Sequence, residues 1–284
     1  MKIGFVGAGK VGFSLGKYLV ERNVCVSGFY SHNLESSKEA AVFTKTKYYE
    51  DLKELIEDSD TLFLTVPDGS IREVYSEIIS SDITGKCIVH CSGALSSEVF
   101  SGIGTRGAFG YSIHPICAVS DRLTGDRDLS KAYFTIEGAK EHLAEFEALF
   151  RQLGNPYAIL MPQDKVKYHA AAVFASNLVA GLYDIAAGLL EECGLDETFA
   201  KEALTPLFLG NAGNIARQGV LQALTGPVER ADTLTVEKHL AELSGETQEI
   251  YRLLSKRLEQ IAKKKHPDRS YDAMDQLLER KEKA

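Results

Sequence analysis

The residues Gly7-Ala8-Gly9-Lys10-Val11-Gly12 form a glycine-rich motif whose spacing suits the binding of a phosphate group. In the pattern G-x-G-x-x-G, the first glycine permits a tight turn, the second lets a pyrophosphate approach the backbone, and the third lets a helix pack on a strand. The motif follows the apolar run 3–6 and opens a helical pattern. The free N–H groups of a helix N-terminus favour an anion. We therefore expect a dinucleotide cofactor here; a glycine turn that binds nothing is the alternative.

The residues after the second predicted strand indicate which dinucleotide is bound. An NAD-selective site normally places Asp or Glu about 20 residues after the glycines, where it binds the ribose 2′-hydroxyl. This chain has Ser31, His32 and Asn33 there, and its first carboxylate is Glu35. Side chains that donate hydrogen bonds suit a 2′-phosphate, so the sequence favours NADP (NADPH) over NAD. A plain polar turn is the alternative.

Two later strand ends are expected to face the same crevice. In an open parallel sheet, ligands bind outside the carboxyl ends of the strands. The segment Val66-Pro67-Asp68 ends one predicted strand, and Ser92-Gly93 follows the next. We expect the first segment along the cofactor's ribose and the second opposite the nicotinamide. Each is also compatible with ordinary turn chemistry.

The elements that must position these residues alternate over the first 160 positions. The predicted strands are 2–6, 24–29, 61–66, 87–91, 108–112, 133–137 and 157–161. The predicted helices between them are 11–21, 36–43, 52–57, 71–79 and 141–153. This alternation is typical of βαβ units and predicts an α/β fold with a doubly wound, mainly parallel Rossmann sheet.

After Pro162 the sequence shows helical patterns alone. The first, 164–193, is rich in alanine and glycine and apolar on most sides, as in a buried helix. Further helices are predicted at 197–208, 211–223, 236–242 and 246–264, with a last turn at 274–278. We therefore expect a Rossmann domain at 1–160 and an all-helical C-terminal domain at 161–284.

The composition narrows the function classes. The chain has 284 residues, 44% of them hydrophobic and 25% charged, which is typical of a soluble globular protein. Its formal net charge of −8 argues against a nucleic-acid partner. Polar residues interrupt the apolar stretch 169–190, so we expect no membrane span. The start of the chain lacks the order of regions found in a signal peptide.

The cysteine content indicates the compartment. The five cysteines, Cys25, Cys87, Cys91, Cys117 and Cys193, are odd in number and lie mostly in apolar segments. Reduced, buried thiols of this kind are typical of a cytoplasmic protein. Cys87 and Cys91 lack a second pair at zinc spacing, so no metal site is predicted.

Several motifs together resemble the 6-phosphogluconate dehydrogenase-like superfamily. They are Val66-Pro67-Asp68, His90-Cys91-Ser92-Gly93, His114-Pro115, YHAAAVFASN at 168–177 and LTGPVERAD at 224–232. The last two are similar to a bacterial group of Rossmann-like oxidoreductases with a helical C-terminal domain of unknown function, and the likeness extends to about residue 260. The resemblance implies an N-terminal Rossmann domain, a helical domain through which members dimerise and, for some similar proteins, an alternative type of ketopantoate reductase.

The resemblance also implies a catalytic helix. Superfamily enzymes often use a lysine on the first long helix, with asparagines one or two turns later. Here His169, Val173 and Asn177 lie at i, i+4 and i+8. His169 takes the lysine position and Asn177 that of the last asparagine, whereas Val173 departs from the pattern. Lys165 and Lys167 are expected on other faces of the helix.

Each polar residue has a functional and a structural interpretation. A histidine such as His169 can protonate an alkoxide as hydride arrives; a hydrogen bond in a domain interface is the alternative. Asn177, if buried, must be satisfied by substrate or by protein. His114, at a strand end, either contacts substrate or fixes the exit of the strand. Arg230 either clamps a substrate carboxylate or forms a surface ion pair with Asp232.

These expectations combine into an NADP-dependent oxidoreductase (dehydrogenase or reductase) that acts on a small carboxylated carbonyl or hydroxy compound. His169 donates the proton, Asn177 orients the carbonyl and Arg230 holds the carboxylate. Ketopantoate reduction is the most specific hypothesis. An imine reductase similar to pyrroline-5-carboxylate reductase and a non-catalytic NADP(H)-sensing regulator are the alternatives. We expect a homodimer whose other partner is a small-molecule substrate.

Overall fold

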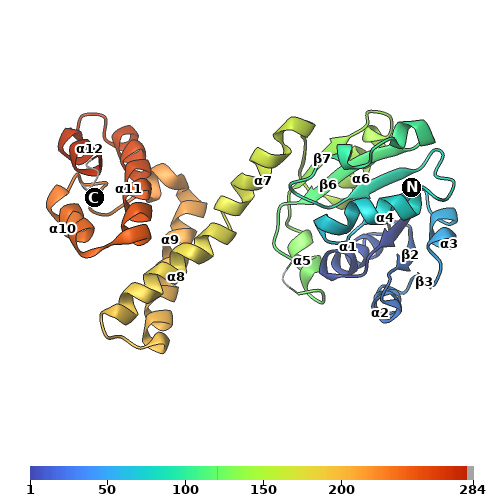
Figure 1. Cartoon of the computed structure of the whole chain (residues 1–284), viewed down its shortest axis with the longest axis horizontal. Coiled ribbons are helices and arrows are strands. Elements are labelled where there is room, and N and C mark those ends of the chain that lie inside the picture. Colours follow the sequence, from blue (N-terminus) through green and yellow to red (C-terminus); the bar gives the residue numbers. More distant parts are fainter. Residues whose placement is uncertain (120, 280–284) are drawn as a thin grey trace. The chain divides into compact units, whose positions relative to one another are not determined.

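The structure is a computed structural model that describes residues 1–119 and 121–279. The chain divides into two compact units, Met1–Ser176 and the residues from Asn177 onward. The first unit contains the sheet and the second is helical (Figure 1). The division falls after Ser176 rather than near residue 160, because the helix that follows residue 164 meets the strand ends of the sheet at Lys165. The assignment of domains to 1–160 and 161–284 stays a prediction.

The first unit is built on one eight-stranded sheet of order β3-β2-β1-β4-β5-β6-β7-β8. Strand pairs are parallel except β6 with β7, which are antiparallel. This confirms the predicted doubly wound, mainly parallel Rossmann sheet. The strands are β1 Ile3–Val6, β2 Val26–Tyr30, β3 Lys47–Tyr49, β4 Thr61–Leu64, β5 Cys87–His90, β6 Phe109–Pro115, β7 Phe134–Gly138 and β8 Tyr157–Ile159.

Helices cover the sheet of the first unit on both faces. They are α1 Lys10–Val20, α2 Leu34–Thr44, α3 Leu52–Glu57, α4 Ile71–Ile78, α5 Gly125–Leu129 and α6 Leu143–Leu153. The unit also includes α7 Lys165–Phe174, which meets the strand ends at Lys165 and extends away from the sheet (Figure 1). Short 3-10 turns lie at η1 Asp68–Ser70, η2 Ser97–Val99, η3 Ile103–Arg106 and η4 Pro162–Asp164. Successive strand side chains point to opposite faces. Accordingly, Phe5 stacks on Phe29 at 5.1 Å in the core beneath α1, whereas Val6 lies in the core beneath α3 and α4.

The predicted elements of the first unit differ from the observed ones at the sheet edge and around residue 125. The short edge strand β3 was not predicted, because its exposed Lys47 and Tyr48 lack an apolar run, and main-chain pairing with β2 holds it in the sheet. The helix α5, with the sequence GDRDL, also lacks helical periodicity. Both differences arise where tertiary contacts rather than local pattern determine the structure.

The second unit consists of helices around a small core. They are α8 Asn177–Glu192, α9 Glu197–Ala223, α10 Thr233–Glu242, α11 Gly245–Lys265 and α12 Asp272–Glu279. The core holds Val228, Val236, Leu240, Ala262, Tyr271, Met274 and Leu278. The two predicted helices 197–208 and 211–223 are continuous in α9, which includes Pro206 and a non-helical Gly219 (φ 77°).

The helices α8 and α9 leave large apolar side chains uncovered. No residue of α8 is buried, and α9 buries only Ala200 and Ala223. Exposed apolar residues of this pair include Leu178, Leu182, Phe199, Leu207, Phe208, Leu209, Ile215, Val220 and Leu221. An exposed apolar surface of this kind marks an interaction site.

Within the described residues, the stretch Pro162–Glu192 is long and apolar enough to cross a membrane by length and composition, with a mean hydropathy of 1.6 over its most apolar window. The single helix predicted at 164–193 is interrupted between Phe174 and Asn177. The resulting helices have 10 and 16 residues, and a membrane-spanning helix needs about 20. Lys165, at the start of the stretch, is buried against the sheet.

Candidate active site

The glycine turn between β1 and α1 has a geometry that only glycines permit. Gly7 has a φ of +103°, and an added Cβ would lie 2.9 Å from the carbonyl oxygen of Thr65. A Cβ at Gly12 would overlap the side chain of Thr65, whose hydroxyl donates to the Gly7 oxygen at 2.8 Å. A Cβ at Gly9 would meet no atom within 4 Å. Protein atoms therefore pack closely against Gly7 and Gly12, whereas the space next to Gly9 is open.

The open side of this turn leads to the N-terminus of α1, where Gly9 is the N-cap. The first turn carries Lys10, Val11 and Gly12 and no acidic residue. Ala8 is buried, and Lys10 is exposed. Backbone N–H groups at a helix N-terminus, together with the helix dipole, favour a phosphate. The six predicted residues from Gly7 to Gly12 therefore form one cradle that fits the pyrophosphate of a dinucleotide.

The residues predicted for the 2′-phosphate follow β2. Asn33 is the N-cap of α2, and its side chain accepts a hydrogen bond from the Glu35 N–H at 3.2 Å. His32 is exposed and lies 3.3 Å from a carboxylate oxygen of Glu77. Ser31 is half-buried. Asn33 and His32 already have protein partners, so Ser31 is the predicted donor that we expect to be most available to a 2′-phosphate.

The strand ends after β4 and β5 are joined by a hydrogen bond. The Ser92 hydroxyl donates to Asp68 at 2.7 Å, and it accepts from the N–H groups of Ala94 and Leu95 at 3.2 and 3.0 Å. Asp68 begins η1 directly after Val66 and Pro67. The two segments predicted to line one crevice therefore meet, as the carboxyl ends of neighbouring parallel strands must.

Two histidines close over Gly93. A Cβ at Gly93 would lie 2.6 Å from Cδ2 of His169 and 2.9 Å from Nε2 of His114. The two imidazole rings are 6.4 Å apart, centroid to centroid. His114 comes from β6 and His169 from α7, so the fold brings together two residues that were predicted separately. Gly93 is required by this close approach and not by its backbone conformation.

The environment of His114 keeps its imidazole neutral. Burial, followed by the charges of Lys165 and His169, lowers the pKa of His114 to about 4. Its Nδ1 lies 2.7 Å from the Tyr168 hydroxyl, and burial raises the pKa of Tyr168. When that hydroxyl donates to Nδ1, the hydrogen of the neutral ring is on Nε2, the atom that faces Gly93. His114 can then donate a hydrogen bond to an oxygen or nitrogen placed there.

Lys165 belongs to the same cluster and was missed by sequence reasoning. Its side chain is 1% exposed, and its ammonium donates to the Ser92 carbonyl oxygen at 2.9 Å and to the Ser112 hydroxyl at 2.8 Å. Burial lowers the pKa of Lys165 to about 8. The expectation that it lies on another helix face than His169 is wrong. Lys165, Tyr168 and His169 stand at i, i+3 and i+4, which is one face of α7.

The predicted stripe of His169, Val173 and Asn177 does not form on one continuous helix. The helix α7 ends at Phe174, and Asn177 begins α8. A turn at Ala175 and Ser176 separates the two helices, and the joint role of His169 and Asn177 stays a prediction. Asn177 belongs to the second unit, as do Arg230 and Asp232.

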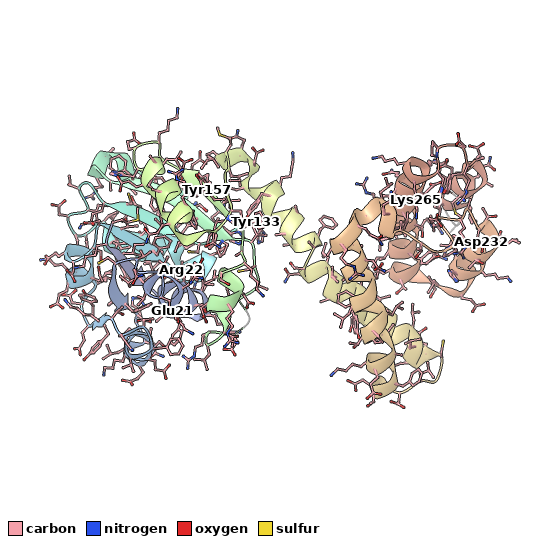
Figure 2. All side chains as sticks on the ribbon, turned by 180° about the vertical axis from the view of Figure 1, so that it is seen from behind. Glu21, Arg22, Tyr133, Tyr157, Asp232 and Lys265 are labelled. Carbon is pink, nitrogen blue, oxygen red and sulfur yellow. The ribbon has the colours of Figure 1, made fainter. Side chains whose placement is uncertain are left out.

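In the second unit, Arg230 and Asp232 occupy a tightly held loop. Asp232, which is labelled in Figure 2, is the N-cap of α10. It accepts hydrogen bonds from the N–H and the hydroxyl of Thr235 at 3.1 and 2.8 Å, and these bonds lower its pKa. Ala231 has a φ of +59°, and Arg230 is exposed. Glu229 anchors the loop through His266 and through Lys265, whose nitrogen is 3.8 Å away. The cap accounts for Asp232 structurally, and Arg230 stays a predicted clamp.

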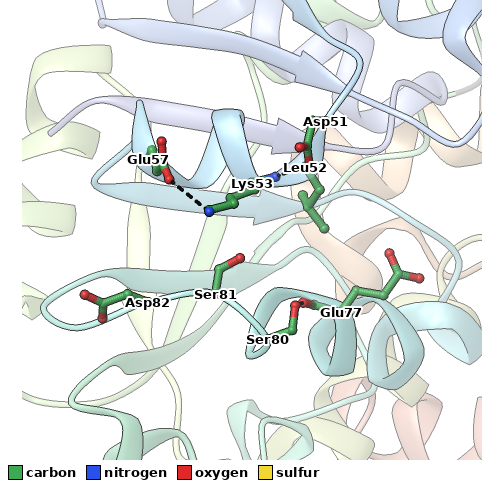
Figure 3. A pocket seen from close by; sticks show the side chains of 8 residues that line it. All are labelled: Asp51, Leu52, Lys53, Glu57, Glu77, Ser80, Ser81 and Asp82. Carbon is green, nitrogen blue, oxygen red and sulfur yellow. Dashed lines mark hydrogen bonds and ion pairs between the residues drawn. The ribbon is translucent and has the colours of Figure 1, made fainter.

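A separate hollow of about 580 Å³ lies between α3 and α4 (Figure 3). Its lining is mainly acidic and hydroxylic, and its one lysine, Lys53, is 3.9 Å from Glu57. Such a lining repels a phosphate. The lining residues are Asp51, Leu52, Lys53, Glu57, Glu77, Ser80, Ser81 and Asp82.

The glycine cradle and the polar strand ends define a Rossmann-type dinucleotide-binding unit. Residues 1–115 match the family of Rossmann-like domains, and residues 132–258 match DUF2520, a domain of unknown function. These matches confirm the expected combination of a Rossmann-like domain with a C-terminal domain of unknown function. The sequence comparison with curated proteins gives no match.

Solved structures share the fold over nearly the whole chain. Protein TM1727 from Thermotoga maritima is 27% identical, with a TM-score of 0.75, over 93% of this chain and 99% of that one. A candidate NADP oxidoreductase from Bacteroides fragilis is 24% identical, with a TM-score of 0.67, over 91% and 98%. A reductive aminase from Aspergillus terreus, in complex with NADPH and ethyl-5-oxohexanoate, is 17% identical, with a TM-score of 0.62, over 90% and 92%.

The close approach at Gly93 predicts the effect of a single methyl group. Gly93→Ala should displace the two imidazole rings and lower the free energy of unfolding by about 1–3 kcal/mol, the usual cost of overpacking. Histidine ring NMR signals and chemical denaturation measure both effects. Gly69→Ala is the matched control, because a Cβ there meets nothing within 4 Å. Unchanged ring signals and stability in Gly93→Ala would contradict the geometry.

Proposed function

We propose that this protein is an NADP(H)-dependent reductase of a small carbonyl or C=N compound. The observation that carries the proposal is the pair His114 and His169 over Gly93, at the same sheet edge as the glycine cradle. This edge offers an anion site and a proton-donating site, as hydride transfer to a polar double bond requires. The likeness to the candidate NADP oxidoreductase and to the NADPH-bound reductive aminase supports the proposal.

The chain's own residues would hold the cofactor at defined places. The cradle from Gly7 to Gly12 would bind the pyrophosphate, and Ser31, with His32 and Asn33, would receive the 2′-phosphate. Val66, Pro67 and Asp68 would lie along the ribose, and Ser92 and Gly93 would face the nicotinamide. NADPH, when bound, supplies the hydride.

The two histidines have different roles in the proposed reaction. His169 would deliver a proton to the substrate oxygen or nitrogen, since histidine is the side chain that most often acts as a general acid. His114, held neutral, would orient the same substrate atom by a hydrogen bond from Nε2. Asn177 would orient the carbonyl and Arg230 would hold a carboxylate, as the sequence predicts. Asp232 would act on Arg230 alone, because its carboxylate already caps α10.

The substrate class remains part of the proposal. A planar guanidinium such as that of Arg230 suits a carboxylate, which favours a small carboxylated carbonyl compound, and ketopantoate is the first candidate. Reduction of a cyclic imine, in the manner of pyrroline-5-carboxylate reductase, is the second, and the imine reductases among the structural neighbours support it. A non-catalytic NADP(H) sensor would bind the cofactor without turnover.

We also propose a homodimer that covers α8 and α9. The exposed apolar residues of these helices exceed what an isolated soluble unit leaves uncovered. A second copy of the chain provides an equally apolar surface, and closed symmetric dimers are the commonest assemblies. All five cysteines are free, which fits the proposed cytoplasmic location. The expectation that they are buried is wrong for Cys25 and Cys193, which are exposed.

The cofactor preference is tested by binding. NADPH should bind more tightly than NADH, and Ser31→Asp should reverse or abolish the preference, because a carboxylate repels the 2′-phosphate. Fluorescence titration of both cofactors measures this. Ser36→Asp, on the half-buried side of α2, is a control for added charge. Equal affinities of the wild-type protein for NADPH and NADH would contradict the NADP assignment.

The chemical roles are tested by kinetics with NADPH consumption as the readout, after a screen of small 2-oxo acids and cyclic imines. His169→Ala should lower kcat by about 10²–10⁴-fold and leave NADPH affinity nearly unchanged, because a general acid is lost. Arg230→Ala should raise KM, and Asn177→Ala should reduce mainly kcat.

The control variant His142→Ala removes a half-buried histidine that directly precedes α6 and should change neither constant. A wild-type rate for His169→Ala would contradict its role as the general acid and leave His114 or a bound water as the proton donor. NADPH binding without turnover across the screen would favour the sensor.

The assembly is tested by light scattering at micromolar concentration. The wild-type protein should be a dimer, and Leu182→Glu with Phe208→Glu should shift it to monomer, because both side chains lie on the exposed apolar pair. Leu123→Glu, at a side chain that is 52% exposed in the first unit, is the control. A wild-type monomer, or partition of the wild-type protein into membranes, would contradict this interface.

A further inference from the structure

The buried ammonium of Lys165 joins three segments of the first unit. From the start of α7 it reaches the Ser92 carbonyl oxygen at the end of β5 and the Ser112 hydroxyl in β6. Ser112 in turn donates to the Ser92 carbonyl oxygen at 3.2 Å. The three groups therefore form a closed set of hydrogen bonds that is out of contact with water, since Lys165 is 1% and Ser112 0% exposed.

Each segment held by Lys165 carries one component of the histidine cluster. Ser92 directly precedes Gly93, and Ser112 lies two residues before His114 on the same strand face. Tyr168 and His169 stand one turn after Lys165 on the same face of α7. A shift of α7 relative to the strand ends would change the separation of the two imidazole rings at once.

We propose that Lys165 is a positioning residue, which fixes His114 and His169 against each other above Gly93. The ammonium does so by its two hydrogen bonds and by its charge. The effect of Lys165 on catalysis rests on the proposed reductase function, whereas its effect on the two histidines does not.

The charged and titratable groups around Lys165 come from every neighbouring element. Asp68 of η1 and Glu137 of β7 stabilise its cation, and so does Cys91 after β5. The cation disfavours protonation of His114 in β6 and of His90 in β5. On α7, Tyr168 has its ring 5.5 Å from the ammonium, and His169 adds to the repulsion felt by His114.

The charge of Lys165 depends on pH in a direction that can be predicted. Burial lowers the pKa of Lys165 to about 8, so the cation is present at neutral pH and is lost as pH rises through about 8. Loss of the cation removes its repulsion of His114, and it also weakens the hydrogen bonds to the Ser92 and Ser112 oxygens, because a neutral amine is a poorer donor than an ammonium. The site should therefore lose its ordered geometry on the alkaline side.

Three variants test the proposal. Lys165→Met removes the charge and the donors and keeps the length of the side chain, Lys165→Arg keeps the charge, and Lys167→Met removes an exposed lysine of the same helix. NMR of the histidine rings gives the titration midpoint of His114, assigned with His114→Asn, and the cross-relaxation between the two rings. NADPH affinity and kcat are measured in parallel.

In Lys165→Met we expect the His114 midpoint to rise by about one pH unit and the cross-relaxation with His169 to weaken. Lys165→Arg and Lys167→Met should keep the wild-type midpoint. NADPH affinity should stay within about twofold, since the cradle is untouched, and kcat should fall by about 10²-fold, as for a misplaced catalytic group.

An unchanged midpoint in Lys165→Met, or an equal rise in Lys167→Met, would overturn the proposal. If Lys165→Met does not fold, a raised midpoint in Lys165→Arg overturns it and a wild-type midpoint supports it. If the midpoint rises as expected but no variant, including wild type, oxidises NADPH with any substrate, the positioning role stands and the reductase function fails.

Discussion

The covering of the parallel sheet on both faces is the constraint on which the site depends. Because helices pack against both faces, the strands are apolar along nearly their whole length, and polar side chains are displaced to the strand ends. The residues after β4 and β5 and the end of β6 therefore gather at one edge. Thr65, Asp68, Ser92 and His114 are neighbours for this reason and not because of any sequence proximity.

Several side chains that can carry a positive charge are buried together at this edge, and burial of each charge costs free energy. A lysine and two buried histidines lie within one cluster, and desolvation penalises the charged form of each. This cost is reduced because only the lysine stays protonated, whereas the two histidines are neutral. Hydrogen bonds and nearby carboxylates stabilise the protonated form of Lys165. The pKa of His114 and that of His90 are each lowered to about 4, so both imidazoles are neutral at neutral pH. A neutral imidazole beside a cation is poised to donate a hydrogen bond without competing for a proton.

Local pattern predicted the parts of this arrangement that are local. The glycine turn was predicted because its glycines, its strand and its helix are contiguous, and the two strand ends because topology alone places them. The contact between His114 and His169 depends on how β6 and α7 are placed relative to each other. The hydrophobic periodicity of the sequence does not specify this placement. Lys165 was assigned to another helix face although it stands four residues before His169, a spacing that places both on one face. The helix predicted at 164–193 was also assumed to be continuous. That helix breaks at Ala175 and Ser176, a turn without proline or glycine to signal it.

The two units bury their apolar side chains to different extents. The first unit encloses its apolar side chains in two cores around the sheet. The second has a core of its own around α10, α11 and α12, yet α8 buries none of its residues. Asn177 and Arg230 are carried by this less covered unit, on the first residue of α8 and on the loop that Glu229 anchors. Any covering of α8 would therefore fall on the same unit that carries Asn177 and Arg230, the residues predicted to bind substrate.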